Sequence, residues 1–188
     1  MKNKLVKTIL FIVMFSGNSF AYAEKKNSFS FKSGSFALNK TSQTIDFSTY
    51  IFEEESTDVF SFEYERQLPN NYSIAVGMTR YSNEILSGSA INTSAEVTHV
   101  MILGRKYLGL SKYFLPYLGV GIGPSIATID GSGISIASLH GVAGLKIPLD
   151  RISLLLEYKV ISSTVKDINS DNFEVSGDGV FAGISFNF

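Results

Sequence analysis

Apolar and polar residues alternate along most of this chain with the two-residue period of a β-strand. The clearest example is the C-terminal segment, in which small or polar residues mostly separate the apolar residues Val180, Ala182, Ile184, Phe186 and Phe188. Similar patterns upstream bring the number of predicted strands to eight, at residues 28–38, 58–68, 72–81, 96–108, 113–129, 134–147, 152–160 and 173–188. The chain is therefore predicted to be all-β.

The connections between these strands alternate in length. Short turns occur at Pro69, Gly109 and Pro148, whereas longer segments join the strands at 39–57, 82–95 and 161–172; the connection at Asp130 is short. Short turns at one end and longer loops at the other are typical of antiparallel outer-membrane barrels. Residues 44–52 also alternate. We interpret them as an extension of the first hairpin beyond the membrane; alternatively, the first strand lies here and 28–38 is periplasmic.

The two faces of the predicted strands differ in size as well as in polarity. In segment 113–129, one face carries Leu118, Val120 and Ile122, while the other carries Gly119 and Gly121. An eight-stranded barrel has an interior barely wide enough for side chains. The small and polar face therefore suits the lumen, and the bulky apolar face suits lipid. A soluble barrel would require the reverse. The pattern predicts an eight-stranded antiparallel up-and-down transmembrane β-barrel.

The N-terminus has the three parts of a signal peptide. Basic residues at Lys2, Lys4 and Lys7 precede an apolar stretch at 8–15, and Ala21 and Ala23 form an A-x-A cleavage site. The apolar stretch is too short to span a membrane as a helix. We therefore expect a signal peptide at 1–23 and a barrel domain at 24–188.

Composition narrows the possible functions. The chain has no cysteine, which excludes disulfides and thiolate metal sites. Removing the three lysines of the signal peptide leaves 13 basic and 17 acidic residues, a net charge of −4, and no basic patch that would bind nucleic acid. The acidic run at 53–55 is expected to be solvated, with divalent cations at the lipopolysaccharide surface as the alternative ligand.

The segment 113–125 (YFLPYLGVGIGPS) resembles a strand motif, P-Y-x-G-x-G-x-G, of small eight-stranded outer-membrane barrels. This family includes the barrel of outer membrane protein A and the opacity-type porin family. The resemblance implies a bacterial outer-membrane location in contact with lipid and lipopolysaccharide. It also implies that Ile184, Phe186 and Phe188 form a C-terminal signal for the barrel-assembly machinery. We expect a monomer with no cofactor.

Charged and polar side chains on the inferred inner face predict a luminal network. Its predicted members are Glu63, Glu65, His140, Glu157 and Lys159. Buried charges must be paired or hydrated, so such a network would fill the lumen and obstruct a pore. Two further lysines, Lys106 and Lys146, fall on the same inferred face; they and Lys159 could instead lie near the rims and meet water.

An enzyme is the alternative to a structural or surface-interaction barrel that acts through its extracellular loops. Ser138 and His140 share a strand face, and Glu157 lies on the next strand, as a catalytic triad would require. Lipid A deacylases of the outer membrane resemble this chain in outline. Their motif, however, is His-x-Ser followed by Asn, whereas here Ser-x-His is followed by Gly141. We therefore predict no catalytic site, and no metal site, since His99 has no partner at ligand spacing.

Overall fold

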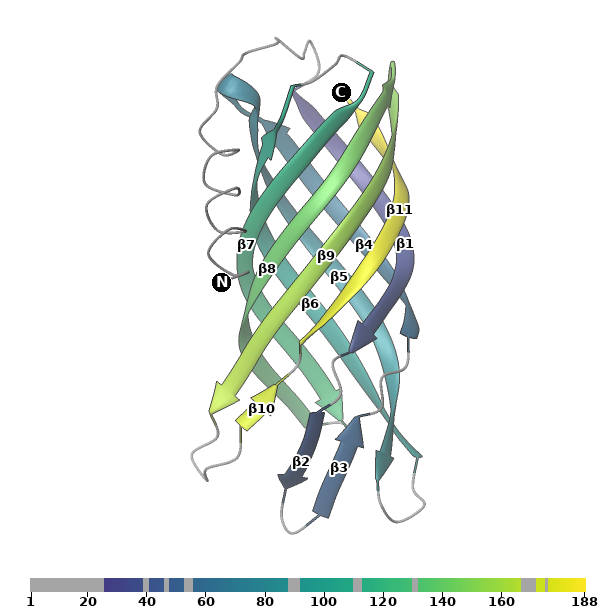
Figure 1. Ribbon diagram of the computed structural model, residues 1–188, viewed down its shortest axis with the longest axis vertical. Helices are drawn as coiled ribbons and strands as arrows, with labels where there is room; N and C mark the ends of the chain where they lie inside the picture. Colours follow the sequence, from purple (N-terminus) through teal and green to yellow (C-terminus); the bar gives the residue numbers. More distant parts are fainter. Residues whose placement is uncertain are drawn as a thin grey trace, which may run out of the picture.

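The structure is a computed structural model that describes residues 26–38, 41–45, 48–52, 56–87, 92–109, 113–129, 132–166, 172–174 and 176–188. It is a closed barrel of eight antiparallel strands (Figure 1), which confirms the predicted fold class. The barrel strands are β1 (Asn27–Leu38), β4 (Ser56–Gln67), β5 (Tyr72–Ser87), β6 (Asn92–Tyr107), β7 (Leu115–Ile129), β8 (Ser132–Leu149), β9 (Ile152–Lys166) and β11 (Gly177–Asn187).

Each barrel strand pairs with its neighbours along the chain, and the last strand closes on the first. In this seam Phe29 of β1 stands opposite Phe186 of β11. The closing pair is Asn27 and Phe188: the Asn27 amide donates to the Phe188 carbonyl at 3.0 Å, and the Phe188 amide donates back at 2.9 Å. Closure leaves no open sheet edge in the wall, as a lipid environment requires.

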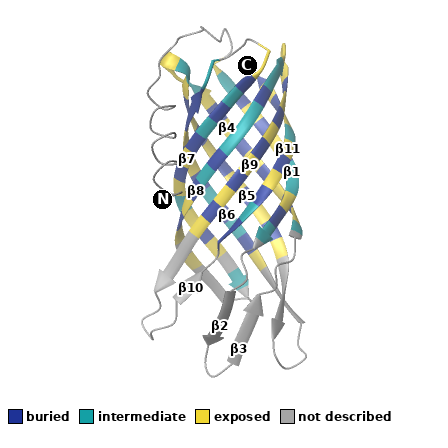
Figure 2. Cartoon of the chain, viewed as in Figure 1, coloured by how far each residue is buried: buried dark blue, intermediate teal, exposed yellow. Residues whose placement is uncertain are grey.

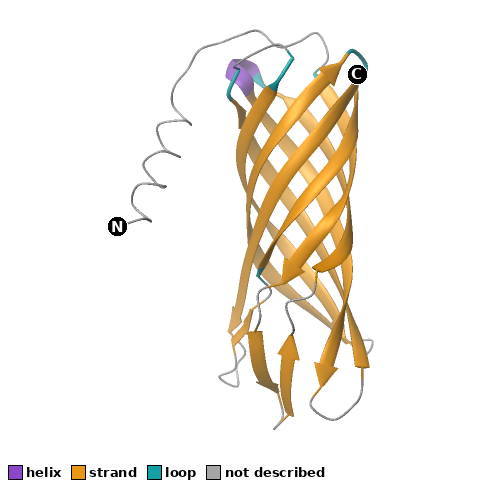
Figure 3. Cartoon of the chain, turned by 45° about the vertical axis from the view of Figure 1, so that its right-hand side comes forward, coloured by secondary structure: helices purple, strands orange, loops and turns teal. Residues whose placement is uncertain are grey.

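The two ends of the barrel differ. One end holds the C-terminus, the 3₁₀ turn η1 (Pro69–Asn71) and the tight turn at Asp150 and Arg151. Asn70, Asn71 and Asp150 have φ angles of 62°, 63° and 61°, a left-handed conformation that Asn and Asp tolerate in tight turns. The opposite end carries β2 (Thr41–Ile45), β3 (Ser48–Phe52) and β10 (Asn172–Glu174) (Figures 1 and 3). Short turns mark the periplasmic end, so β2, β3 and β10 lie at the outer end.

The described residues of segment 44–52 belong to this outer end and do not form the first barrel strand. β2 and β3 pair with each other, and β3 continues onto β5 through Tyr50 and Ile51, which face Ser87 and Leu86. The hairpin therefore extends the wall beyond the membrane, and the alternative that places the first strand at 44–52 is wrong. Residues 1–23 and 53–55 lie outside the described part of the chain.

Several strands are longer than their apolar patterns predict. β5 continues to Ser87, β6 begins at Asn92 and β9 continues to Lys166, although segments 82–95 and 161–172 were expected to be loops. Paired antiparallel strands satisfy their backbone hydrogen bonds without apolar side chains, so pairing can continue where the membrane ends. Hydrophobicity thus marks the membrane-facing part of a strand rather than its full length.

Burial alternates along most of the described length of the barrel strands, which gives the wall a chequered pattern (Figure 2). On β9, Leu154, Leu156 and Tyr158 are 44–54% exposed, whereas the intervening Glu157 and Lys159 are buried. The bulky apolar side chains therefore face outward and the polar ones face the lumen, as the sequence pattern predicted.

The outward-facing side chains form an apolar belt with charged edges. On β4 the outward row runs from Asp58 through Phe60, Phe62 and Tyr64 to Arg66. Asp58 and Arg66 are separated by about 26 Å of strand at ~3.3 Å per residue, or roughly 20 Å of height at a tilt of ~40°. This height is close to the apolar band of about 25 Å found on outer-membrane barrels. Among the described residues, no helix has the length and hydropathy needed to cross a membrane.

Candidate functional site in the barrel lumen

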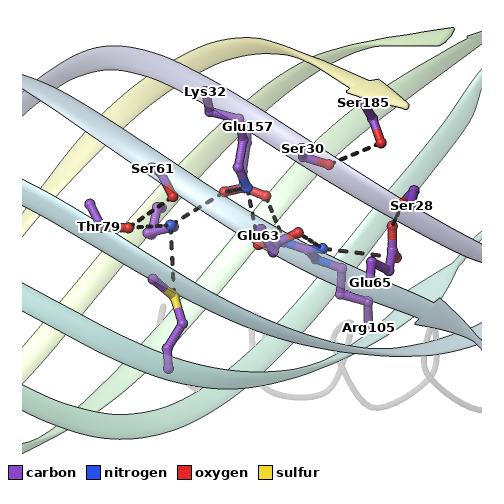
Figure 4. Close-up of polar contacts among 12 residues, drawn as sticks. Ser28, Ser30, Lys32, Ser61, Glu63, Glu65, Thr79, Arg105, Glu157 and Ser185 are labelled. Carbon is purple, nitrogen blue, oxygen red and sulfur yellow. Dashed lines mark hydrogen bonds and ion pairs between the residues drawn. The ribbon is translucent and has the colours of Figure 1, made fainter. Parts of the chain in front are cut away.

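The predicted luminal residues all lie inside the barrel. Glu63, Glu65, His140, Glu157 and Lys159 are each at most 3% exposed. They come from three strands, β4, β8 and β9, because alternate residues of each strand point inward. Figure 4 shows the acids and their partners converging from opposite parts of the wall.

The central part of the lumen is a compact ion-pair cluster. Glu157 accepts hydrogen bonds from Lys32 Nζ at 2.8 Å, from Arg105 Nη2 at 3.0 Å and from the Tyr117 hydroxyl at 2.8 Å. Glu63 accepts from both terminal nitrogens of Arg105, with the Nη2 contact at 2.7 Å, and from Lys32 at 3.2 Å. Arg105 and Lys32 therefore each bridge the same two carboxylates (Figure 4).

A second group lies toward the periplasmic end, around Glu65. Its carboxylate accepts from the hydroxyls of Ser73 at 2.5 Å and Tyr107 at 2.6 Å, and from Ser28 at 3.3 Å. Lys146 Nζ lies 3.3 Å from the same carboxylate, and so its charge is paired inside the barrel. These contacts link β1, β4, β5, β6 and β8 across the lumen.

Lys159 has a weaker set of partners than the other luminal cations. Its Nζ donates to Thr79 Oγ1 at 3.2 Å and lies 3.6 Å from Glu157, which also serves Lys32 and Arg105. The ring centroid of Phe181 is 4.9 Å away. A nearby aromatic face stabilises a cation by roughly 0.5–2 kcal/mol. The ring therefore supplements the shared carboxylate.

The cluster is buried in the lumen. Lys32, Glu63, Arg105 and Glu157 are each at most 3% exposed although they project from four different strands. Removing one partner from such a buried group leaves an uncompensated charge, at a cost of about 3–5 kcal/mol. The contacts therefore hold strands together across the barrel as well as filling it.

Two luminal cations, Lys32 and Arg105, were missed by the sequence reasoning. Strand β6 has apolar residues on both faces, so its parity could not be read, and Lys106 was expected inside instead of Arg105. Lys106 lies on the outward row opposite Tyr72, with its Nζ 4.1 Å from that ring and 2.6 Å from the Asn70 carbonyl. The sequence did offer one indication of these cations: three carboxylates predicted to face inward require basic side chains on the inner face to pair with them.

The two histidines lie in a separate layer nearer the outer end. Ser138 Oγ is 2.8 Å from His140 Nε2, and it is also 2.8 Å from the Gly123 carbonyl oxygen. His99 contacts Ser125, and its ring centroid lies 5.7 Å from that of His140. Within the described part of the chain, His140 Nδ1 has no hydrogen-bond partner, and no group of His, Asp and Glu side chains could hold a metal ion.

This layer brings a serine and a histidine together without the third member of a triad. Glu157, the carboxylate that the sequence suggested, is occupied by Lys32 and Arg105 rather than by His140. A triad needs a group that orients the histidine from its second nitrogen. The described residues supply a serine–histidine contact and no orienting carboxylate.

The predicted C-terminal residues lie on the outer face. Ile184, Phe186 and Phe188 are exposed on the lipid-facing row of β11, and Phe188 also completes the barrel seam. Ala21 and Ala23, the predicted cleavage site, lie outside the described residues.

No family model matches the chain, and neither does the sequence of any curated protein. The structure is similar to Neisserial surface protein A, with a TM-score of 0.64 and 14% identity over 86% of this chain and 97% of that one. It is also similar to OprG from Pseudomonas aeruginosa, with a TM-score of 0.61 and 12% identity over 87% and 97% of the two chains. Ail, the attachment invasion locus protein of Yersinia pestis, aligns with a TM-score of 0.52 and 14% identity over 88% and 100%.

These similarities concern the fold. Together with the apolar belt, they identify the architecture as that of a small eight-stranded outer-membrane β-barrel. The chain therefore has the architecture expected of a protein in the bacterial outer membrane.

Proposed function

We propose that this protein is a closed outer-membrane barrel that acts through its outer end, in a structural or surface-interaction role, rather than as a general pore or an enzyme. The observation that carries this proposal is the ion-pair cluster of Lys32, Glu63, Arg105 and Glu157, which fills the lumen at mid-height. Side chains already fill an eight-stranded barrel of this size, so the wall encloses no wide channel.

The outer end supplies the surface for an interaction. β5, β6 and β9 continue past the belt there, and the β2–β3 hairpin adds to that end (Figure 3). β2 and β3 carry hydroxyl, amide and aromatic side chains but no charged residue. One structure of Ail contains a heparin analogue, sucrose octasulfate. The hairpin of this chain has no basic residue, and Asp46 lies between its two strands, so it suits a less anionic partner.

The surroundings proposed for the barrel are outer-membrane lipid and lipopolysaccharide. The barrel-assembly machinery would insert it as a monomer. Inside the membrane the barrel is closed by its own seam between β1 and β11, so it needs no second chain to satisfy its backbone.

Conductance measurements in planar lipid bilayers test the closed lumen. The purified protein should show no steady ion current, because the charged side chains at mid-height are paired and buried. The double variant Lys32→Ser, Glu63→Ser shortens two crossing side chains and serves as the comparison, since it should raise the frequency of current steps. Steady pore-like current through the unaltered protein would contradict the proposal.

Epitope insertion tests which end acts at the cell surface. An epitope inserted between Ile45 and Ser48 should bind antibody on intact cells. The matched insertion between Asp150 and Arg151 should be labelled only after the outer membrane is permeabilised. The opposite result would place the hairpin in the periplasm and exclude it as a surface for external partners.

Lipid A acyl hydrolysis is the competing function, because Ser138 Oγ lies 2.8 Å from His140 Nε2. We propose that these two residues are not catalytic, since the described residues offer His140 no orienting carboxylate. Mass spectrometry of lipid A should give the same acyl chains in cells with the unaltered protein, with Ser138→Ala and without the gene. Loss of an acyl chain that requires Ser138 would establish the enzyme.

A further inference from the structure

The lipid-facing surface contains a groove of about 780 Å³ across strands β6 to β9. Its rims carry large apolar side chains, including Ile102, Ile122 and Leu139. Between them the outward positions are small: Ser135 and Ala137 on β8 and Ser162 on β9. These small residues interrupt the row of bulky apolar side chains on this part of the wall.

The groove is deep enough to reach residues of the inner face. Met101 and Ser138 both line it, although they are only 0% and 5% exposed. Their neighbours Val100 and Leu139 point outward. The groove is therefore bordered by residues from both faces of the wall.

An interruption in strand pairing lies beneath the groove. β6 and β7 keep one register on both sides of it, with His99 opposite Ser125 and Ile102 opposite Ile122. In the pairing that the structure describes, Val100 and Met101 are not matched with the Pro124 and Gly123 that this register would place opposite them.

The residues at the interruption explain it. Pro124 has no amide hydrogen to donate to the neighbouring strand. A side chain on Gly123 would place its Cβ only 1.8 Å from the Val100 carbonyl oxygen, so only glycine fits there. The Gly123 carbonyl lies 2.8 Å from the Ser138 hydroxyl, which donates to it.

The depth of the groove in the membrane follows from its position along β7. Thr128 of β7 stands opposite Glu96, the charged residue at the outer edge of the belt on β6. Pro124 is four residues from Thr128, or about 13 Å along the strand. Because this is about half of the strand length that spans the belt, Pro124 lies near the middle of the belt, and the groove extends from there toward the outer edge at Ser135, which stands opposite Ile126.

We propose that this groove binds one acyl chain of an outer-leaflet membrane lipid, held more tightly than the lipid around the rest of the barrel. Within the bilayer, an apolar hollow cannot be filled by water at low cost and is filled by hydrocarbon. The small residues let the chain lie against the wall, and the apolar rims contact it on both sides. This site does not depend on the outer-end function proposed above.

Retention of lipid during purification tests the proposal. The protein is extracted from outer membranes in mild detergent, and bound lipid is counted by native mass spectrometry. Ala137→Phe fills the groove, and Ser162→Phe fills it independently from another strand. Ala182→Phe is the matched control, since Ala182 is also outward and exposed but lies on β11, away from the groove. Heat-modifiable gel mobility verifies that each variant is folded.

The unaltered protein and Ala182→Phe should each retain one lipid per chain, whereas the two groove variants should retain roughly tenfold less, the effect of about 1.4 kcal/mol of lost affinity. Equal retention by folded groove variants and the control would overturn the proposal. So would an unaltered protein without bound lipid, a free fatty acid as the retained mass, or a second copy of the chain in place of lipid.

Discussion

Arg105 joins two carboxylates that come from different strands, Glu63 on β4 and Glu157 on β9. Replacing it by methionine would keep much of the side-chain volume but leave both acids with fewer partners. We expect Arg105→Met to lower the free energy of unfolding by about 3–5 kcal/mol, the cost of breaking a buried ion pair from one side. Urea unfolding of the refolded barrel in lipid vesicles would measure this change.

The matched control is Arg66→Met, because Arg66 lies on the exposed outer row at the periplasmic edge of the belt. Exposed substitutions of this kind usually change stability by no more than ~0.5 kcal/mol. If both variants unfold at the same urea concentration, the luminal cluster does not hold the strands together, and its role is limited to filling space.

The outer face gives a second test at the level of single residues. Leu156 lies in the middle of the outward row of β9 and is 54% exposed, while Ile152 begins the same strand beside the turn. Leu156→Arg should destabilise the barrel by about 2–4 kcal/mol, and Ile152→Arg by ~0–1 kcal/mol, because the cost of a charge falls toward the membrane surface. The difference in unfolding free energy between the two variants reports how deeply each position lies in the membrane. Equal costs would contradict the assignment of Leu156 to the middle of the belt and Ile152 to its edge.

Among the elements, the periplasmic turns depend on residues that accept a left-handed backbone. Asn70, in the turn between β4 and β5, has a φ of 62° and a ψ of 33°. Asn70→Val should cost about 1–2 kcal/mol of stability, since a branched side chain is strained in this conformation. Asn70→Gly should unfold at the same urea concentration as the unaltered protein or a slightly higher one. A valine variant as stable as the glycine variant would show that the turn changes its conformation.

The strands themselves were predictable from the sequence because each buries one face, and a period of two results. Their outer ends were not predictable. Residues 82–87 contain Ile85 and Leu86 side by side and do not alternate with a period of two, yet they extend β5, because pairing with β6 satisfies the backbone there. Separating a polar loop from a polar strand extension requires knowledge of the neighbouring strand, which no single segment contains.

The luminal site was predictable only in part. Glu63 and Glu157 could be placed inside because their strands alternate cleanly. Arg105 could not, since Leu103 on its own face and Ile102 on the other are equally apolar. The contacts between these residues depend on the register of four strands around the barrel, and a period within one strand does not determine register between strands.

In the whole molecule, a set of charged side chains lies in the lumen and apolar side chains form the outer belt. Three carboxylates and four cations among the described residues are enclosed by the wall, so the central cluster carries an excess of positive charge at Lys159. On β4, the outward row carries charged residues only at the two edges of the belt, at Asp58 and Arg66. This arrangement lets strands rich in charged residues cross an apolar layer, and it fixes the height of the barrel in the membrane.

Phe188 lies at the end of the seam between β1 and β11 that closes the barrel. Its ring is 61% exposed at the periplasmic edge of the belt, and its backbone forms two hydrogen bonds with Asn27 at the seam. An aromatic ring at this depth sits favourably between lipid and water. The resemblance to outer-membrane barrels also makes Phe188 part of the predicted assembly signal. Deletion of Phe188 should therefore sharply reduce the heat-modifiable, folded fraction in the outer membrane and leave unfolded protein in the periplasm.

Phe188→Tyr separates the ring from the rest of this prediction. It keeps the backbone pair with Asn27 and an aromatic ring suited to the interface, so its folded fraction should be close to that of the unaltered chain. Phe188→Ser keeps the backbone pair but removes the ring. If assembly depends on the ring, the serine variant should fail as the deletion does. A serine variant that assembles normally, beside a deletion that does not, would assign the effect to the seam hydrogen bonds alone.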